Sequence, residues 1–294
     1  MNKKYLFSVR ACASSANLGP GFDRAAIALN IFNRYRVAGF KAGFEVRDLR
    51  RGQPAAVEGS LMVKAIKHTL KTCGHSLEKG LAIDFEQDII PGAGLGSSAA
   101  EIVGAIMITD RAYRLGLDAG SRLDIAQALE HHPDNVAAAL GGGMVVCYRD
   151  KGRYHYQKVA VCPQLEILLF VPRSGVVTEK ARHLIPQKIP VADATDNIAN
   201  FCLLTEALKK GDLERAAIFI KDRIHQPYRS GIYPRSMELV NRLLDDYGIP
   251  AAISGSGPSV VAFFHRNIRL AEGLEFEGFN LIRTSIDFNG SMYY

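Results

Sequence analysis

The sequence contains no long hydrophobic run. None of its apolar segments, over 294 residues, reaches the roughly 18 residues of a membrane-spanning helix. Lys3-Lys4 and the apolar residues 5–9 imitate the start of a signal peptide, but Arg10 interrupts the run long before an h-region is complete. We therefore expect a soluble, cytoplasmic protein with no membrane partner.

Cysteines are few, and their spacing fits no known framework. The five cysteines are an odd number, and no two form a C-x-x-C pair. This pattern argues against a disulfide scaffold and against a zinc knuckle. We expect buried thiols in a reducing compartment.

The chain also lacks a dense basic patch. Its net charge is +6, but no basic cluster exceeds a pair such as Arg50-Arg51. The interleaved aromatic residues of single-strand binders are absent as well, which argues against nucleic acid as a partner. A basic balance also suits an enzyme with anionic substrates.

A glycine-rich loop at residues 91–100, Pro-Gly-Ala-Gly-Leu-Gly-Ser-Ser-Ala-Ala, is the most informative segment. Gly92, Gly94 and Gly96 let backbone N–H groups approach a ligand closely, and two serines follow. Residues 81–86 alternate as a half-buried strand does, and residues 99–108 have helical periodicity. A strand, a glycine loop and a helix N-terminus in this order predict a phosphate site.

Three better-known interpretations of this loop do not fit. No Lys precedes the serines, as a Walker A loop requires, and the glycine spacing differs from the dinucleotide fingerprint. A hydrolase triad of Ser97 or Ser98 with His132 and Asp134 lacks the G-x-S-x-G elbow. Taken alone, the loop could also be a flexible connection.

The remaining segments predict an α/β (α+β) chain. Strands are expected at residues 5–11, 27–35, 43–46, 81–86, 144–148 and 165–171, on both sides of a turn within 251–264, and as a pair within 281–294. Helices are expected at residues 61–73, 99–108, 121–130, 135–140, 178–184, 194–210, 213–224 and 235–247. A change of composition near residues 149–155 predicts two domains, 1–154 and 155–294.

Residues 130–135, Glu-His-His-Pro-Asp-Asn, gather polar groups between two expected helices. A zinc site is unsuitable, because adjacent histidines project in different directions and no cysteine is near. One carboxylate with a hydroxyl and substrate phosphates suits Mg²⁺ better. The segment is equally compatible with a helix C-terminus, where histidines favour the negative end of the dipole and Asp134 caps the next helix.

One amide, one acid and two arginines complete the candidate residues. Asn17 and Asp23 lie in a segment dense in turn formers, where they could be ordinary turn residues. A guanidinium binds a carboxylate through two parallel hydrogen bonds, so Arg182 and Arg229 could together orient an acid substrate. Solvated arginines at helix ends are the alternative.

Taken in order, three segments resemble the motifs of the GHMP kinase superfamily of small-molecule kinases. They are residues 15–23 (Ser-Ala-Asn-Leu-Gly-Pro-Gly-Phe-Asp), 91–100 and 253–260 (Ile-Ser-Gly-Ser-Gly-Pro-Ser-Val). Residues 16–23, 132–136 and 225–229 give the closest resemblance to the homoserine kinases within it. The resemblance covers nearly the whole chain. It implies a mixed sheet with helices in the first domain, a ferredoxin-like second domain and a nucleotide between them.

The resemblance also implies an activity, namely ATP-dependent phosphorylation of the side-chain hydroxyl of L-homoserine, with ATP and Mg²⁺ as cofactors and a homodimer as the assembly. The implied catalytic residues are Ser98, Glu130, His132 and Asn135, of which Ser98 and Glu130 hold Mg²⁺. The implied homoserine contacts are Asn17, Asp23, Asn135, Arg182 and Arg229. The implied nucleotide contacts are Ser60, Leu61, Met62 and Val63 near adenine, and Pro91, Gly92, Ala93, Gly94, Leu95, Gly96, Ser97 and Ser98 near the triphosphate.

The sequence departs from the family pattern at several positions. Asn135 stands where related mevalonate kinases are expected to carry an Asp base, so we expect direct attack on the γ-phosphate without a strong general base. Arg24-Ala25-Ala26 replaces a Ser-Leu-Gly type of run, and His131, Ala138 and Ser60 stand where Gly, Pro and Asn are usual. These departures leave open another hydroxylated amino acid, a sugar or a mevalonate-like acid as substrate. A sensor that binds ATP and a metabolite without turnover is an alternative from another class, and the intact Ser98 and Glu130 argue against it.

Overall fold

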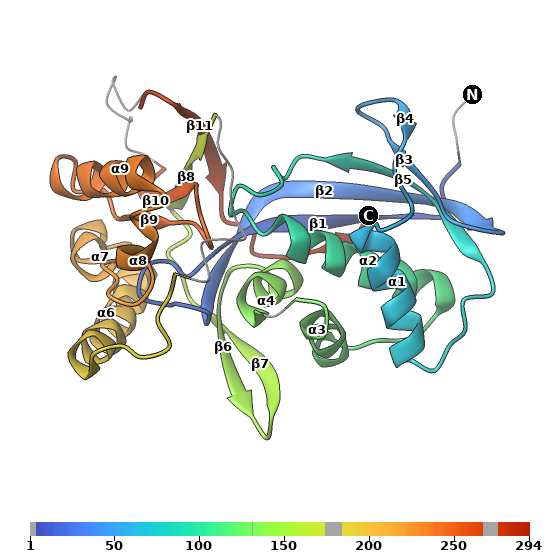
Figure 1. The fold of residues 1–294 in the computed structure, drawn as a ribbon, viewed down its shortest axis with the longest axis horizontal. Helices are drawn as coiled ribbons and strands as arrows, with labels where there is room; N and C mark the ends of the chain where they lie inside the picture. Colours follow the sequence, from blue (N-terminus) through green and yellow to red (C-terminus); the bar gives the residue numbers. More distant parts are fainter. Residues whose placement is uncertain (1–3, 131, 174–183, 267–275) are drawn as a thin grey trace.

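The chain folds into two lobes that lie side by side (Figure 1) in a computed structural model, which describes residues 4–130, 132–173, 184–266 and 276–294. The first lobe contains an eight-stranded mixed sheet, and the second contains a four-stranded antiparallel sheet. The predicted two-part α+β fold is therefore confirmed. No helix in the described ranges combines the length and apolar character that a bilayer crossing requires.

The sheet of the first lobe has the strand order β12-β1-β2-β5-β3-β4, with β6 paired to β2 and β7 paired to β6. Among the strands in the described ranges, β3 and β5 are the one pair of this sheet that runs parallel. Its strands are β1 (Phe7–Ala16), β2 (Ala25–Lys41), β3 (Glu45–Asp48), β4 (Gln53–Pro54), β5 (Gly80–Gln87), β6 (Met144–Asp150), β7 (Arg153–Val159) and β12 (Met292–Tyr293).

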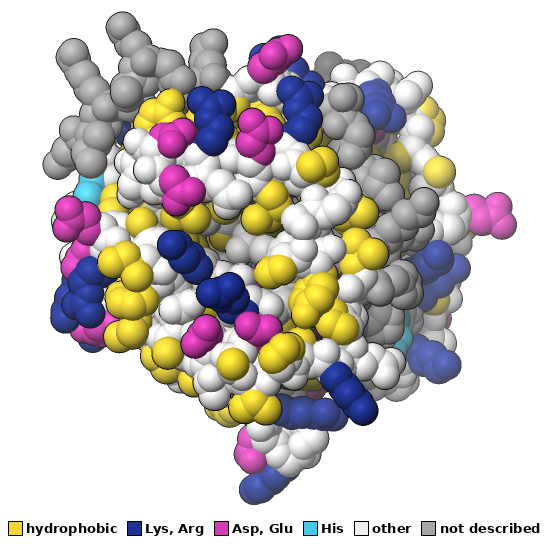
Figure 2. All heavy atoms as spheres, turned by 60° about the vertical axis from the view of Figure 1, so that its left-hand side comes forward, with side chains coloured by type: hydrophobic (Ala, Val, Ile, Leu, Met, Phe, Trp, Pro, Cys, Tyr) yellow, Lys and Arg dark blue, Asp and Glu magenta, His cyan; other side chains and the backbone are white. Residues whose placement is uncertain are grey.

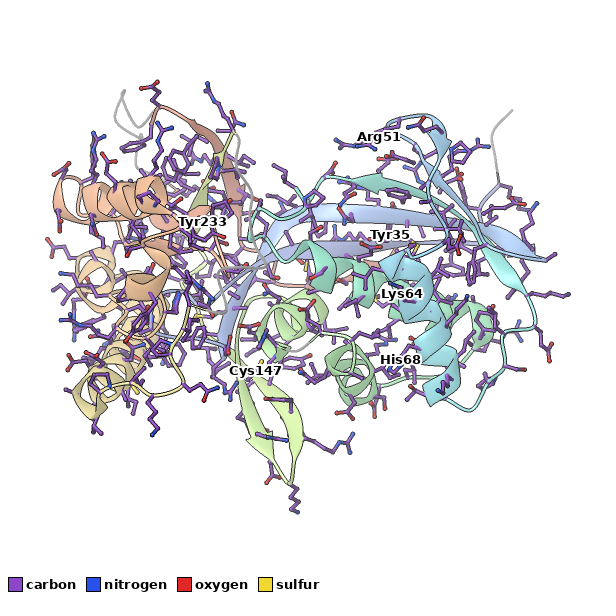
Figure 3. The ribbon with its side chains drawn as sticks, in the orientation of Figure 1. Tyr35, Arg51, Lys64, His68, Cys147 and Tyr233 are labelled. Carbon is purple, nitrogen blue, oxygen red and sulfur yellow. The ribbon has the colours of Figure 1, made fainter. Side chains whose placement is uncertain are left out.

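Four helices pack along one side of this sheet (Figure 1): α1 (Leu61–Thr72), α2 (Ser97–Tyr113), α3 (Ala119–Gln127) and α4 (Pro133–Gly141). The central helix is α2, which is buried from Ala99 to Asp110 except at Glu101. Tyr35 of β2 is buried in this layer (Figure 3), and burial raises the pKa of its hydroxyl. A helix that is apolar nearly all round belongs in a core, so α2 is the fixed element on which the glycine loop ends.

The second lobe has the strand order β11-β8-β10-β9, and all of its pairs are antiparallel. Its strands are β8 (Leu165–Pro172), β9 (Ala251–Ile253), β10 (Val260–His265) and β11 (Phe279–Ser285). Its helices are α6 (Val191–Lys210), α7 (Leu213–Phe219), α8 (Gln226–Arg229) and α9 (Pro234–Asp245).

The two faces of β8 pack into two different hydrophobic clusters. Ile167 and Leu169 join the main core, which continues into the first lobe, whereas Leu168 and Phe170 pack with α9. Successive side chains of a strand point to opposite faces, so a strand buried on both faces is a continuous apolar run. The main core therefore extends through both lobes and joins them.

Most predicted elements are confirmed, and the differences have physical reasons. The strand expected at 27–35 is longer, because β2 pairs with β1, β5 and β6 along its length. The helix expected over 213–224 ends at Phe219, before a turn organised by Asp222. The two tail strands do not pair with each other, because β11 joins the second sheet and β12 the first.

The segment at 149–155, where a domain border was expected, contains the turn of the β6–β7 hairpin and the strand ends on either side of it. The division into 1–154 and 155–294 falls within β7, and as a division into domains it stays a prediction. The helix expected at 178–184 lies almost entirely outside the described residues.

Candidate active site

Three loops that are far apart in the sequence meet at a cleft of about 670 Å³. Ser14 N donates to Leu95 O at 3.1 Å, and Gly255 N donates to Ala16 O at 3.0 Å. Ser259 N donates to Ala93 O at 3.3 Å, which links the third loop to the glycine loop. The segments that carried the sequence motifs therefore form one continuous wall.

The glycine loop connects β5 to α2 and can only be built with glycine at two of its positions. Gly94 and Gly96 have φ values of +78° and +66°. A Cβ at Gly94 would lie 2.3 Å from Ser254 O, and one at Gly96 would lie 2.2 Å from Ser14 Oγ. Positive φ and close packing thus both exclude a side chain. The loop is held against the β9–β10 turn, where Ser254 Oγ donates to Gly94 O at 2.7 Å.

The backbone of this loop fits an anion. Within the described residues, none of the N–H groups from Gly92 to Ala99 donates a hydrogen bond to a protein acceptor. Gly92, Gly94, Gly96, Ser97 and Ser98 line the cleft, and α2 begins at Ser97. A row of N–H groups at the positive end of a helix dipole is suited to the oxygens of a phosphate chain.

Ser98 and Glu130 lie together at this end of the cleft. Ser98 Oγ donates to Glu130 Oε2 at 2.7 Å, although the two residues come from α2 and from the segment after α3. No group of three or more His, Cys, Asp or Glu side chains suited to a metal occurs among the described residues. A metal here would need ligands from phosphates and water, which is the usual way that Mg²⁺ is bound.

Asp23 and His132 form a second polar group in the cleft. Asp23 lies in the β1–β2 loop with a φ of +55°, and its Oδ2 is 3.6 Å from His132 Nδ1. Asn17 stabilises this strained loop, because its Oδ1 accepts from Asp23 N at 3.0 Å and its Nδ2 donates to Gly255 O at 2.7 Å. The Asn17 side chain therefore joins the loop of Asp23 to the β9–β10 turn.

Asn135 lines the cleft from the first turn of α4, and its amide contacts Ser14. Ser14 Oγ donates to Asn135 Oδ1 at 2.8 Å. With the amide oxygen placed on the Ser14 side, Nδ2 is left as the donor for other groups. An amide in this orientation donates to a ligand rather than accepting a proton from it.

Arg229 lies in α8 with only 2% of its side chain exposed, yet it lines the same cleft. Its Nη1 donates to Gly255 O at 2.7 Å and lies 3.1 Å from His225 Nδ1. The guanidinium also lies over the ring of Phe22, 5.7 Å from its centre. These contacts fix the plane of the guanidinium, as two-pronged binding of a carboxylate requires.

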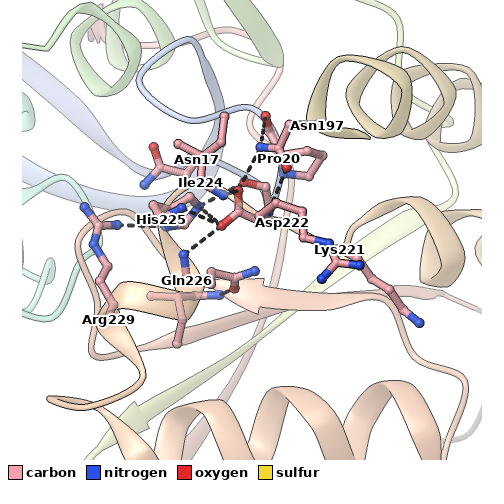
Figure 4. A network of polar contacts seen from close by, with 12 residues as sticks. Asn17, Pro20, Asn197, Lys221, Asp222, Ile224, His225, Gln226 and Arg229 are labelled. Carbon is pink, nitrogen blue, oxygen red and sulfur yellow. Dashed lines mark hydrogen bonds and ion pairs between the residues drawn. The ribbon is translucent and has the colours of Figure 1, made fainter. Parts of the chain in front are cut away.

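A buried network behind Arg229 fixes its position (Figure 4). His225 Nε2 lies 2.9 Å from Gly19 O, and a carbonyl can only accept, so Nε2 carries the hydrogen and Nδ1 faces Arg229. Burial lowers the pKa of His225, against the opposing effect of the Asp222 carboxylate nearby. A neutral imidazole of fixed tautomer is therefore the partner of the Arg229 guanidinium.

Asp222 is the centre of this network. Its Oδ2 accepts from His225 N at 2.9 Å and from Gln226 N at 2.7 Å, so the carboxylate caps α8. Its Oδ1 accepts from Asn197 Nδ2 at 2.8 Å, and the same amide lies 3.3 Å from Pro20 O. The loop that carries Asp23 and the helix that carries Arg229 are thus held by one carboxylate.

A further part of the cleft is lined by residues from α1, β5 and α2. Leu61 and Gln87 lie there with Glu101. Glu101 Oε1 accepts from Met62 N at 2.9 Å, and burial raises the pKa of its carboxyl. The contact ties the start of α1 to α2, one helical turn beyond the glycine loop.

The structure brings most of the predicted residues to the cleft. The ones that line it are Asn17, Asp23, Leu61, Pro91, Gly92, Gly94, Leu95, Gly96, Ser97, Ser98, Glu130, His132, Asn135 and Arg229. Ser60, Met62, Val63 and Ala93 do not line it, and Met62, Val63 and Ala93 are buried in the protein. Arg182 lies outside the described residues. The functional roles of all these residues stay predictions.

Sequence reasoning did not identify Gln87, Glu101 or the partnership of Ser14 with Asn135. Asp134 had been considered only as a helix cap or a triad acid, but it is buried and lines the cleft. The sequence does carry one signal for Glu101 and Asp134: each is a polar residue in a helix, α2 or α4, that is otherwise largely apolar.

The fold and the glycine loop define a class of small-molecule kinases, and comparison with known proteins agrees. The family model described as the GHMP kinase N-terminal domain matches residues 60–143, and the one described as the GHMP kinase C-terminal domain matches residues 204–275. The chain belongs to the GHMP kinase family.

Several relatives of the chain within this family carry the name homoserine kinase. A homoserine kinase from Clostridium beijerinckii is 31% identical, over 97% of this chain and 98% of its own. One from Streptomyces coelicolor is 37% identical, over 86% and 83% of the two chains. The crystal structure of homoserine kinase from Cytophaga hutchinsonii has the same fold, with a TM-score of 0.81, 24% identity and coverage of 100% of this chain and 99% of that one.

Proposed function

We propose that this chain transfers the γ-phosphoryl group of ATP to the side-chain hydroxyl of L-homoserine. The observation that carries the proposal is one cleft that contains the open N–H groups of the glycine loop together with Asp23 and Arg229. The first group suits a triphosphate, and the acid and guanidinium suit the ammonium and carboxylate of an amino acid. Relatives over nearly the whole chain that bear the name homoserine kinase support the same substrate.

Each side chain has a role in this proposal. Arg229, with Arg182 as a second contact, binds the carboxylate of homoserine, and Asp23 binds its ammonium group. Asn17 holds the loop of Asp23 in place and contributes to the same site. Leu61, with its neighbours Ser60, Met62 and Val63, belongs to the adenine side.

The loop amides from Gly92 to Ser98 bind the phosphate oxygens and stabilise charge that develops during transfer. Ser98 and Glu130 would hold Mg²⁺, whose contribution is to neutralise and orient the phosphates. Ser98→Ala and Glu130→Gln should each raise the Mg²⁺ concentration at half-maximal rate, while the KM for homoserine stays unchanged. An unchanged Mg²⁺ dependence in both variants would remove these residues from the metal site.

Phosphoryl transfer depends mainly on positioning and charge stabilisation, so a strong base is not required. The hydroxyl oxygen of homoserine forms the new bond to phosphorus as the bond to the leaving ADP oxygen breaks. Asn135 donates its Nδ2 hydrogen to the reacting groups, because its Oδ1 is engaged by Ser14. The hydroxyl proton then passes to the transferred phosphoryl group.

The pair of Asp23 and His132 favours one alternative mechanism. A carboxylate 3.6 Å from His132 Nδ1 could orient the imidazole as a general base. In the direct mechanism, His132→Gln keeps substantial turnover and the pH dependence of kcat is unchanged. If His132→Gln abolishes turnover while homoserine still binds, base catalysis by His132 replaces the direct mechanism.

A panel of acceptors tests the substrate. ADP release is measured with homoserine, threonine, serine and mevalonate, in the wild type and in Arg229→Lys. We expect a clear preference for homoserine, and for the variant a raised KM for homoserine, because an ammonium cannot form two parallel bonds to a carboxylate. Equal rates with mevalonate would contradict an amino-acid site, and binding without ADP release would indicate a sensor.

We also propose a homodimer in the cytoplasm, as the family resemblance implies. The second lobe presents a surface (Figure 2) on which hydrophobic side chains lie among charged ones, and Val191, Ile198 and Ile218 are exposed on α6 and α7. The five cysteines are free, which suits a reducing compartment. Light scattering should give twice the chain mass of 32.2 kDa, and a single-chain mass would contradict the dimer. Cell fractionation tests the compartment.

A further inference from the structure

Glu101 is a charged side chain in the most buried helix of the first lobe. Between Ala99 and Asp110 it is the one residue of α2 that keeps partial exposure. A carboxylate in apolar surroundings is costly unless its oxygens form hydrogen bonds. The partners of its two oxygens therefore decide what this residue does.

One of these oxygens has a partner in the protein. Glu101 Oε1 accepts from Met62 N at 2.9 Å, in the first turn of α1. Ser60, the N-cap residue of α1, makes no side-chain capping bond, so Glu101 supplies the acceptor in its place. Oε2 has no partner among the described residues, and Glu101 lines the cleft, so this oxygen is available to a ligand.

The position of Glu101, close to the end of the glycine loop, indicates that this ligand is the nucleotide. Glu101 lies one helical turn after Ser97, where the glycine loop ends and α2 begins. Leu61 and Gln87 line the cleft with it, and Gln87 Nε2 lies 3.4 Å from Ser97 Oγ. Asp23, His132 and Arg229, which the proposed function assigns to the acceptor side, come from other elements and have no contact with Glu101 among the described hydrogen bonds and ion pairs.

We infer that Glu101 selects adenine by accepting a hydrogen bond from its exocyclic amine. This inference rests on the proposed function, since it concerns the nucleotide that the loop would bind. Hypoxanthine and guanine carry a carbonyl at the same ring position, which would place two acceptors against each other. A carboxylate selects guanine by accepting two adjacent N–H donors, one on each oxygen. In Glu101, Oε1 already accepts from Met62 N, so only Oε2 remains for the base. Leu61 supplies apolar surface beside the ring.

The test compares ATP with ITP, which differ at that position by an amine and a carbonyl. Both are assayed with homoserine in the wild type, in Glu101→Gln and in Glu58→Gln, an exposed control near the same helix end. Glu101→Gln keeps an oxygen for Met62 N and turns an N–H donor towards the cleft. We expect the wild type to favour ATP by about tenfold or more in kcat/KM, Glu101→Gln to lose or reverse this preference, and the control to retain it.

A wild type that uses ITP as well as ATP, or an unchanged ratio in Glu101→Gln, overturns the inference and leaves the kinase proposal standing. If homoserine is not phosphorylated with either nucleotide, the proposed function fails. Calorimetric titration of ATP and ITP into the wild type and the two variants then decides the role of Glu101, because base selection is already expressed in binding.

Discussion

Replacing Gly96 by alanine tests how tightly the glycine loop is built. Gly96 caps α2 with φ +66°, and a Cβ there would lie 2.2 Å from Ser14 Oγ and 3.0 Å from Asn135 Oδ1. A left-handed backbone costs alanine about 1 kcal/mol. Moving Ser14 aside disturbs its 2.8 Å bond to Asn135 and strains the packing, which costs about 2 kcal/mol more.

We therefore expect Gly96→Ala to lower the free energy of unfolding by about 3 kcal/mol. Gly116→Ala is the matched control, because Gly116 has φ +69° but nothing within 4 Å of a Cβ. The control should lose only the backbone contribution of about 1 kcal/mol. Urea unfolding followed by circular dichroism measures both variants.

A double-mutant cycle identifies the cause of the extra cost. Ser14→Ala removes the 2.2 Å contact with Ser14 Oγ but leaves the one at 3.0 Å with Asn135 Oδ1. In that background Gly96→Ala should therefore cost less than in the wild type and come closer to the cost of Gly116→Ala. Activity should also fall in Gly96→Ala by about tenfold or more in kcat/KM for ATP, because the loop amides are displaced. Equal costs for Gly96→Ala and Gly116→Ala in the wild-type background would refute the close packing of loop and site.

Three further predictions concern the buried groups. Burial raises the pKa of the Cys12 and Cys147 thiols to about 12, so alkylation of the folded protein near neutral pH should label the exposed Cys202 first, which peptide mass spectrometry detects; labelling of Cys12 before Cys202 would contradict the packing. Burial lowers the pKa of His225 beneath its usual 6.5, so below that pH the unfolded chain binds a proton that the folded chain does not. The free energy of unfolding should therefore fall as pH falls, and His225→Gln should make this dependence shallower in urea unfolding at several pH values. An equal slope in the variant would contradict a neutral His225. Asp222→Asn should lower the free energy of unfolding by about 3 kcal/mol and raise the KM for homoserine, because an amide accepts fewer of the four hydrogen bonds that end on this carboxylate; a neutral result would remove Asp222 from the network.

The parts of the site that depend on local geometry could be predicted from the sequence. Glycine at positions 94 and 96 is compatible with the positive φ angles that the loop adopts. Hydrophobic periodicity predicts the strand before the loop and the helix after it. Their meeting with Asp23 and Arg229 could not be derived from spacing, because it depends on the packing of two lobes. The family resemblance supplied that part, and the cleft agrees with it.

Other features were hidden because tertiary contacts reverse their local appearance. Glu101 in a helical sequence is an ordinary solvent-facing residue until the packing around α2 is known. The strand β7 was missed because its charged residues conceal the alternation of Tyr154 and Tyr156, which are both half-buried. Asp222 was predicted to be part of a helix, but its carboxylate accepts backbone bonds that form the turn before α8.

The measurement that tests the central claim most directly is product analysis with L-homoserine, ATP and Mg²⁺. Phosphorus NMR should show one O-phosphohomoserine formed for each ADP released, with no ADP release when homoserine is omitted. Arg229→Lys should form the same product with a raised KM for homoserine. ADP release that does not depend on homoserine, or the absence of a phosphorylated amino acid, would contradict the account.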